Sequence, residues 1–120
     1  MQLARGERRY RRKVASPKQW QAIIQTKQGP CRVCEAETGT TKRPAYGGTY
    51  HHLVSREDHG DDIADNIVPL CWNHHDDVTR RFPSACSALL ATLAPAERAY
   101  MAARGGPDYA ERAYGVEYQR

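Results

Sequence analysis

The sequence predicts a small α+β domain with a ββα unit at its centre. Two short segments, 49–54 and 66–70, are rich in β-branched and apolar residues and are typical of strands, and a helical pattern follows over residues 72–81. Pairs of metal-ligating residues flank the strands, and only 8% of the 120 residues are aromatic, so a bound metal would supplement a thin apolar core. No repeat or linker interrupts the chain, which we interpret as one domain, 1–120, with residues 31–82 as its metal-stapled core.

A basic arm precedes the first predicted helix. Residues 1–13 hold six arginine or lysine side chains and one glutamate, so they carry +5, whereas the chain as a whole carries +4. We interpret residues 1–15 as a flexible arm suited to phosphates, because each neutralised phosphate releases a counterion. The alternative is a solvated tail that only aids solubility. The arginines expected to contact phosphates are Arg8, Arg9, Arg11 and Arg12.

A helix is expected over residues 16–28. Ser16 can cap its first turn, a proline follows at the position that favours proline, and Gln19 completes a capping box. A Gly-Pro pair then ends the helix. Segment 35–49 is rich in threonine, glycine and lysine and predicts an irregular loop. The apolar residues on one face of the helix are Trp20, Ile23 and Ile24.

Two pairs of metal ligands share one spacing. Cys31 and Cys34 form the first pair, and Cys71 and His74 form the second, with 36 residues between the pairs. Two ligands three residues apart on a tight turn can reach one ion, and two such pairs complete a tetrahedron. Zn²⁺ prefers thiolate and imidazole, so we expect a structural zinc with no open position; unlinked thiols beside a surface histidine are the alternative. Cys86 lies outside both pairs and is expected to be a buried thiol in a helix.

Residues 83–120 predict a helical extension. Ser84 can cap a helix that reaches Leu93, a proline at position 95 can open a second helix, and a short third helix is expected over residues 107–114. The apolar side chains of this extension are expected to pack on the small core. They are Leu89, Leu90, Leu93, Tyr100, Met101, Tyr109 and Tyr114.

No apolar run approaches the roughly 20 residues that a membrane-spanning helix needs. The first residues also lack the apolar stretch of a secretory signal. We therefore expect a cytoplasmic protein without a membrane partner, whose cysteines bind metal or stay reduced rather than form disulfides.

The segment "YHHLVSREDHGDDIADNIVPLCWNHH" resembles the HNH endonuclease family, also called the ββα-metal nucleases. Thirteen residues separate His52 from Asn66 and eight separate Asn66 from His75, which agrees with the family pattern, and a cysteine pair lies upstream as in zinc-containing members. The likeness covers roughly residues 31–78. It implies a ββα-metal fold and a metal-dependent endonuclease that hydrolyses phosphodiester bonds of DNA.

The resemblance also implies a role for each matching residue. His52 corresponds to the general base that activates a water for attack on phosphorus. His51 and His75 correspond to ligands of a catalytic divalent cation such as Mg²⁺, Mn²⁺ or Ni²⁺. Asn66 corresponds to the asparagine that holds the loop and orients the base.

Arginines near the motif complete the expected DNA contacts. By likeness, Arg56 is expected to contact the scissile phosphate. The residues expected to contact the DNA backbone are Arg80, Arg81, Lys42 and Arg43. An ordinary solvated side chain is the alternative for each. His59 and the aspartates of its loop are expected to be solvated surface residues; the alternatives are a substrate contact by His59 and a second metal at the aspartates. These aspartates are Asp58, Asp61, Asp62 and Asp65.

This sequence departs from the family pattern at three places. His74 replaces the fourth zinc cysteine, so either His74 or His75 completes the zinc site, and the spacing favours His74. His51 stands where many members have aspartate, which lowers the negative charge of the site. The loop reads Asp58-His59-Gly60 where the family usually has a Gly-Gly pair, so its backbone is expected to differ.

The size and the helical tail also resemble small HNH proteins of bacteriophages. This likeness implies phage DNA processing in the host cytoplasm, with a phage terminase as a partner. The alternative functions are a non-catalytic zinc-stabilised DNA-binding module and a regulatory or protein-interaction domain. A zinc deaminase is excluded by motif, because the chain has no His-x-Glu followed by Pro-Cys-x-x-Cys.

Overall fold

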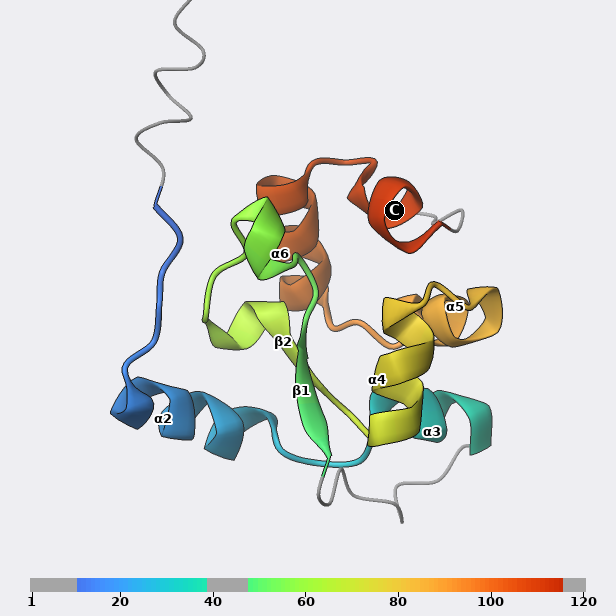
Figure 1. The fold of residues 1–120 in the computed structure, drawn as a ribbon, viewed down its shortest axis with the longest axis horizontal. Coiled ribbons are helices and arrows are strands. Elements are labelled where there is room, and N and C mark those ends of the chain that lie inside the picture. The colour runs from blue at the N-terminus through green and yellow to red at the C-terminus, as the bar shows by residue number, and fades with distance from the viewer. Residues whose placement is uncertain (1–10, 39–47, 116–120) are drawn as a thin grey trace, which may run out of the picture.

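The computed structural model describes residues 11–38 and 48–115, which form an α+β fold of helices around a small sheet (Figure 1). The predicted α+β class is therefore confirmed. Within the described ranges, no helix is long and apolar enough to cross a membrane. The elements are α2 (Pro17–Lys27), α3 (Arg32–Thr38), β1 (Thr49–His52), the 3₁₀ turns η1 (Arg56–Asp58) and η2 (Ala64–Asn66), β2 (Ile67–Leu70), α4 (Trp72–Thr79), α5 (Pro83–Ala91), α6 (Pro95–Gly105) and the π-helical turn η3 (Ala110–Tyr114).

The sheet consists of β1 and β2, which pair in antiparallel orientation with Thr49 opposite Leu70 and His52 opposite Ile67. All four residues of β2 are buried, and α4 begins directly after it, so the chain runs β, β, α as expected. The first strand ends two residues earlier than predicted. The chain leaves the strand direction after His52 and enters the inter-strand loop, residues 53–66.

The capping box predicted for the first helix is confirmed. The Ser16 side chain accepts the Gln19 backbone N–H at 3.1 Å, and the Gln19 side chain accepts the Ser16 N–H at 2.9 Å. The expected loop from residue 35 is wrong for its described part, because α3 extends to Thr38. Its first turn closes when the Glu35 N–H donates to Cys31 O at 2.9 Å, and alanine and glutamate then favour helix. Residues 39–47 lie outside the described residues.

The C-terminal extension supplies much of the core, as we expected from its apolar residues. Cys86 of α5 is fully buried, and its Sγ–H donates to Val78 O of α4 at 3.7 Å. The start of α5 differs from the prediction, because Phe82 rather than Ser84 is the N-cap. A proline at the first helical position fixes that start, since it needs no hydrogen bond there.

A buried carboxylate connects three helices. Glu97 of α6 is 1% exposed, and it accepts two hydrogen bonds from Arg32 at 2.8 and 2.9 Å and one from Lys27 at 2.5 Å. It also accepts the Ala94 N–H at 2.7 Å. Burial raises the pKa of Glu97, but these hydrogen bonds outweigh burial and lower the pKa to about 2. The carboxylate is therefore ionised at neutral pH and holds α6 against α2 and α3.

We expect Glu97→Gln to lower the free energy of unfolding by roughly 3 kcal/mol, because it leaves two cations without their buried counter-charge. Urea unfolding at neutral pH measures the change. Glu111→Gln is the matched control, since Glu111 is exposed, and it should change stability by less than about 0.5 kcal/mol. Equal stability of the two variants would contradict the structural role of Glu97.

Candidate functional site

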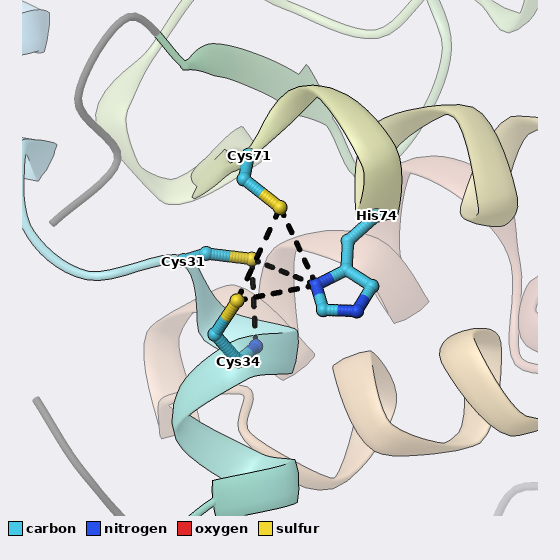
Figure 2. A group of neighbouring side chains, drawn as sticks. All are labelled: Cys31, Cys34, Cys71 and His74. Carbon is cyan, nitrogen blue, oxygen red and sulfur yellow. Dashed lines mark hydrogen bonds between the residues drawn. The ribbon is translucent and has the colours of Figure 1, made fainter. Parts of the chain in front are cut away.

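Four metal-ligating side chains meet between α3 and the start of α4 (Figure 2). The ligand atoms of Cys31, Cys34, Cys71 and His74 lie within 4.8 Å of one another. His74 Nδ1 lies 3.4 Å from the Cys31 and Cys34 sulfurs and 3.5 Å from the Cys71 sulfur. Ligands at the corners of a zinc tetrahedron are about 3.6 Å apart for nitrogen and sulfur. The four residues can therefore hold a metal ion.

The surroundings of the cluster are compatible with a bound metal. The other ring nitrogen of His74 lies 3.3 Å from the Glu37 carboxylate, the kind of partner that orients a metal-bound imidazole. Burial and the neighbouring Cys31 and Cys71 thiols raise the pKa of Cys34 to about 12. Its thiol therefore stays protonated at neutral pH unless a cation offsets the charge of the thiolate. His74, as the spacing favoured, faces the sulfurs, and the side chain of His75 lies elsewhere.

Three other histidines line one cleft of about 650 Å³, which we call the histidine cleft. His51 and His52 come from the end of β1, and His75 comes from the first turns of α4. Neighbouring residues on a flat strand point to opposite faces, but the strand ends at His52, and both rings reach the cleft. The structure therefore brings together the three histidines that the sequence singled out.

His51 is held by the tyrosine at the end of η3. Its Nε2 lies 2.9 Å from the Tyr114 hydroxyl, which donates its own proton to Leu53 O at 2.6 Å. Because that hydroxyl has one proton, His51 must carry its hydrogen on Nε2 and its lone pair on Nδ1. Burial, with smaller contributions from His75 and His52, lowers the pKa of His51 to about 3.

His75 is fixed in a similar way from the start of β1. The Thr49 hydroxyl donates to Leu70 O at 3.0 Å and lies 2.5 Å from His75 Nδ1. His75 therefore donates from Nδ1, and its lone pair is on Nε2. Burial and the nearby His52 lower the pKa of His75, so the ring is neutral at neutral pH. Its centroid lies 5.2 Å from that of His51, at 80° between the ring planes.

His52 lies between a carboxylate and an indole. Its Nε2 lies 2.8 Å from Asp62 Oδ1, and its ring stacks on Trp20 of α2 with centroids 6.0 Å apart. An ionised carboxylate accepts but does not donate, so His52 carries its proton on Nε2 and its lone pair on Nδ1. Burial lowers the pKa of His52 although Asp62 raises it. The ring is thus neutral, as a general base must be.

Two loop aspartates are not solvated, which corrects the sequence-based expectation. Asp61 and Asp62 are 6% and 7% exposed, whereas Asp58, His59 and Asp65 are exposed as expected. Burial raises the pKa of Asp62, but its hydrogen bonds and the nearby arginines lower that pKa below its ordinary value. The buried aspartates are tolerated because each accepts several hydrogen bonds.

The described end of the basic arm is also not a free tail. Arg12 donates to Gly60 O at 2.7 Å and to Asp62 Oδ1 at 2.5 Å, so its guanidinium binds the protein rather than phosphates. Arg11 is exposed, and Arg8 and Arg9 lie outside the described residues. The interpretation of residues 1–15 as a flexible arm is therefore wrong for its last residues, which dock on the inter-strand loop.

Asn66 holds the inter-strand loop, as the resemblance implied for its side chain. It is fully buried, accepts the Val54 N–H at 2.8 Å, and donates to Val54 O at 3.0 Å and Asp61 O at 2.9 Å. Gly60 is packed against this arrangement, since a Cβ there would lie 1.7 Å from Val54 O. His59 takes the left-handed conformation next to it, with φ at 68°.

Arginines surround the histidine cleft. Arg56 lines it with a side chain 59% exposed and with its Nε 3.6 Å from Asp62 Oδ1. Arg81, which was expected at the DNA backbone, also lines it, as does Arg112, which was not singled out from the sequence. Arg80, expected at the DNA, does not line the cleft; its guanidinium pairs with Asp76 at 3.5 Å and lies over the Phe82 ring.

Sequence reasoning missed the residues that support the histidines. Asp62 was interpreted as a solvated residue, although the Asp-Asp pair between a glycine and the loop asparagine was a possible signal. The tyrosines of the extension were assigned only to the core, yet their hydroxyls bind the loop. They lie 39 or more positions from their partners, and no local pattern marks such contacts. These tyrosines are Tyr100, Tyr109 and Tyr114.

No protein-family model, curated protein or solved structure matches the chain. The function of the site must therefore be inferred from its residues and their geometry. Those residues are four side chains that could hold a metal ion and, separate from them, three neutral histidines in a cleft rimmed by arginines.

We expect Gly60→Ala to lower the free energy of unfolding by at least about 2 kcal/mol, because the new Cβ would displace Val54 and the Asn66 amide. Thermal or urea unfolding measures the loss. The control is His59→Gly, which adds no atoms and relieves a positive φ, and it should keep stability within about 1 kcal/mol. A Gly60→Ala protein as stable as the wild type would show that the loop is not packed as described.

Proposed function

We propose that Cys31, Cys34, Cys71 and His74 hold a structural Zn²⁺. The separations between their ligand atoms fit a tetrahedron, and three sulfurs with one imidazole nitrogen are a donor set that zinc accepts. Glu37 supports the ring of His74 from the other side. All four positions would come from the protein, so this ion would stabilise the fold and take no part in chemistry.

Removal of this zinc should abolish cooperative unfolding, because binding energy at such a site is largely folding energy. The measurement is thermal unfolding with and without a strong chelator, followed by re-addition of Zn²⁺. Cys34→Ser should lower the zinc content below one ion per chain, and Cys86→Ala, outside the cluster, should retain it. An unfolding transition that the chelator leaves unchanged would rule out the structural zinc.

We propose further that the protein is a metal-dependent endonuclease of the HNH type that hydrolyses phosphodiester bonds of DNA. The observation that carries the proposal is the histidine cleft, in which His51, His52 and His75 are held with their lone pairs on defined nitrogens. Hydrolysis of a phosphodiester needs an activated water, positive charge around the phosphate and support for the leaving oxygen. The cleft offers residues for each need.

His52 is the proposed general base. Its Nδ1 would take a proton from the water that attacks phosphorus, a new P–O bond would form, and the bond from phosphorus to the 3′-oxygen would break. Burial keeps the ring neutral and able to accept this proton. Asn66 would act through the loop, since its three hydrogen bonds fix the backbone that leads from His52 to Asp62.

His51 and His75 are the proposed ligands of the catalytic cation. In the described part of the chain neither His51 Nδ1 nor His75 Nε2 has a hydrogen-bond partner, so both lone pairs can bind a metal. Two imidazoles on one ion, at a ligand angle of roughly 90–110°, have centroids about 4.5–5.2 Å apart, and these rings are 5.2 Å apart. Mn²⁺, Ni²⁺ or Mg²⁺ would supply positive charge to the scissile phosphate and the leaving oxygen.

Arginines favour a polyanionic substrate. Arg56 lines the same cleft as the histidines with a largely exposed side chain and could bind a phosphate next to the scissile one. Arg81 and Arg112 add positive charge to the cleft, although their guanidinium groups also bond backbone oxygens of the protein. The choice of DNA as the substrate comes from the resemblance of residues 31–78 to the HNH family. The geometry of the histidines supports phosphodiester hydrolysis in general.

Plasmid cleavage tests the proposed nuclease. Zinc-loaded wild type should nick or cut supercoiled DNA when Mg²⁺, Mn²⁺ or Ni²⁺ is added, and His52→Ala should be about 100-fold slower or worse, because it lacks the base. Both proteins must contain one zinc per chain. His59→Asn is the matched control, since His59 is an exposed histidine of the same loop, and it should cleave like the wild type.

Two results would contradict the proposal. Equal cleavage by wild type and His52→Ala would indicate a contaminant or another base. Absence of cleavage by either, with DNA still bound, would favour the non-catalytic zinc-stabilised DNA-binding module.

A further inference from the structure

We infer that Asp62 is a positioning residue for the His52 base, and that the segment from Arg12 to Ala15 holds Asp62 in place. We call residues 12–15 the N-terminal strap. The inference deepens the proposed nuclease function, on which its catalytic part rests. It assigns the strap to the active site and not to a DNA-binding tail.

The strap contacts the inter-strand loop through both side-chain and backbone atoms. Arg12 bonds Gly60 O at 2.7 Å and Asp62 Oδ1 at 2.5 Å, and the Ala15 N–H donates to Asp62 Oδ2 at 3.0 Å. The Asp62 N–H donates in turn to Lys13 O at 2.8 Å. Asp62 is thus held at its backbone and at both carboxylate oxygens, by residues about 50 positions away in the chain.

The carboxylate of Asp62, held in this way, faces one ring nitrogen of His52. Asp62 Oδ1 lies 2.8 Å from His52 Nε2, and the two side chains are only 4% and 13% exposed. Trp20 stacks on the same imidazole, with 8° between the ring planes. Rotation of the ring would break the bond to Asp62, so the carboxylate keeps the hydrogen on Nε2 and leaves Nδ1 as the proton acceptor.

The contact between Asp62 and His52 is not needed merely to anchor the strap. The neighbouring Asp61 already anchors it, because its carboxylate accepts the Lys13 N–H at 2.7 Å and the Tyr100 hydroxyl at 2.7 Å. The second carboxylate, that of Asp62, is the one that His52 contacts. Arg12 and Arg56 lie beside Asp62 and keep it ionised, which is the state that only accepts hydrogen bonds.

The two aspartates provide a matched test. Asp62→Asn replaces one acceptor oxygen by an amide that can also donate, so His52 should no longer be confined to the Nε2–H tautomer. Nitrogen-15 NMR of the histidine rings in the zinc-loaded full chain reports the tautomer directly.

Plasmid cleavage with Mn²⁺ gives a second readout. Asp62→Asn should lower kcat about 10–100-fold, which is a part of the 10²–10⁴-fold that a general base supplies, and KM for DNA should be nearly unchanged. Asp61→Asn should lower stability but keep the tautomer and kcat.

Arg12→Lys and Arg12→Met test the strap itself. Lysine retains the charge beside Asp62 and should keep most of kcat, whereas methionine should lower kcat in the same direction as Asp62→Asn. An Asp62→Asn protein with the wild-type tautomer and kcat would overturn the inference. Equal losses of kcat in Asp61→Asn and Asp62→Asn, in step with their melting temperatures, would also overturn it, since the role would then be structural only.

The NMR comparison keeps this inference separate from the nuclease proposal. A wild type that cleaves no DNA would defeat the proposed function alone. The tautomer of His52 in wild type and in Asp62→Asn would still decide whether Asp62 positions the ring.

Discussion

The buried side chain of Asn66 holds the inter-strand loop in one shape, and the rest of the site depends on that shape. Its amide is fully buried, and it bonds the backbone of Val54 at the start of the loop and of Asp61 in the middle, through one acceptor and two donor positions. Gly60 allows this close approach because it has no side chain. The same fold of the loop turns Asp62 toward His52 and offers Gly60 O to Arg12. One amide side chain thereby helps to position His52.

Two polar clusters supplement the apolar core, and both converge on the start of α3. Cys31 and Cys34 contribute two side chains to the Cys/His cluster, and Arg32, between them, binds the buried Glu97. The start of α3 therefore joins the Cys/His cluster to the C-terminal extension. The extension in turn reaches the histidine cleft through the hydroxyl of Tyr114. Stability and the geometry of the candidate site are coupled through these few polar side chains.

Local patterns predicted much of this protein, and contacts distant in sequence did not follow from them. The Ser16 capping box, the order of strands and helix, and the four metal-ligating residues were all predictable, because a cap or a ligand pair is defined within a few residues. The burial of Asp62 and the docking of Arg12 were not, since each depends on a partner about 50 residues away. Charge alone suggested solvent for Asp62 and phosphate contact for Arg12. Folding instead pairs the two charges, which makes their burial tolerable.

The central claim is that a water, deprotonated by His52, attacks phosphorus and expels the 3′-oxygen. The most direct test is to cleave a defined DNA duplex with zinc-loaded protein and Mn²⁺ in ¹⁸O-labelled water, and to identify the product ends by mass spectrometry. The account predicts 3′-hydroxyl ends and 5′-phosphate ends that carry one ¹⁸O atom. Ends with a 3′-phosphate, or 5′-phosphates without the label, would contradict it.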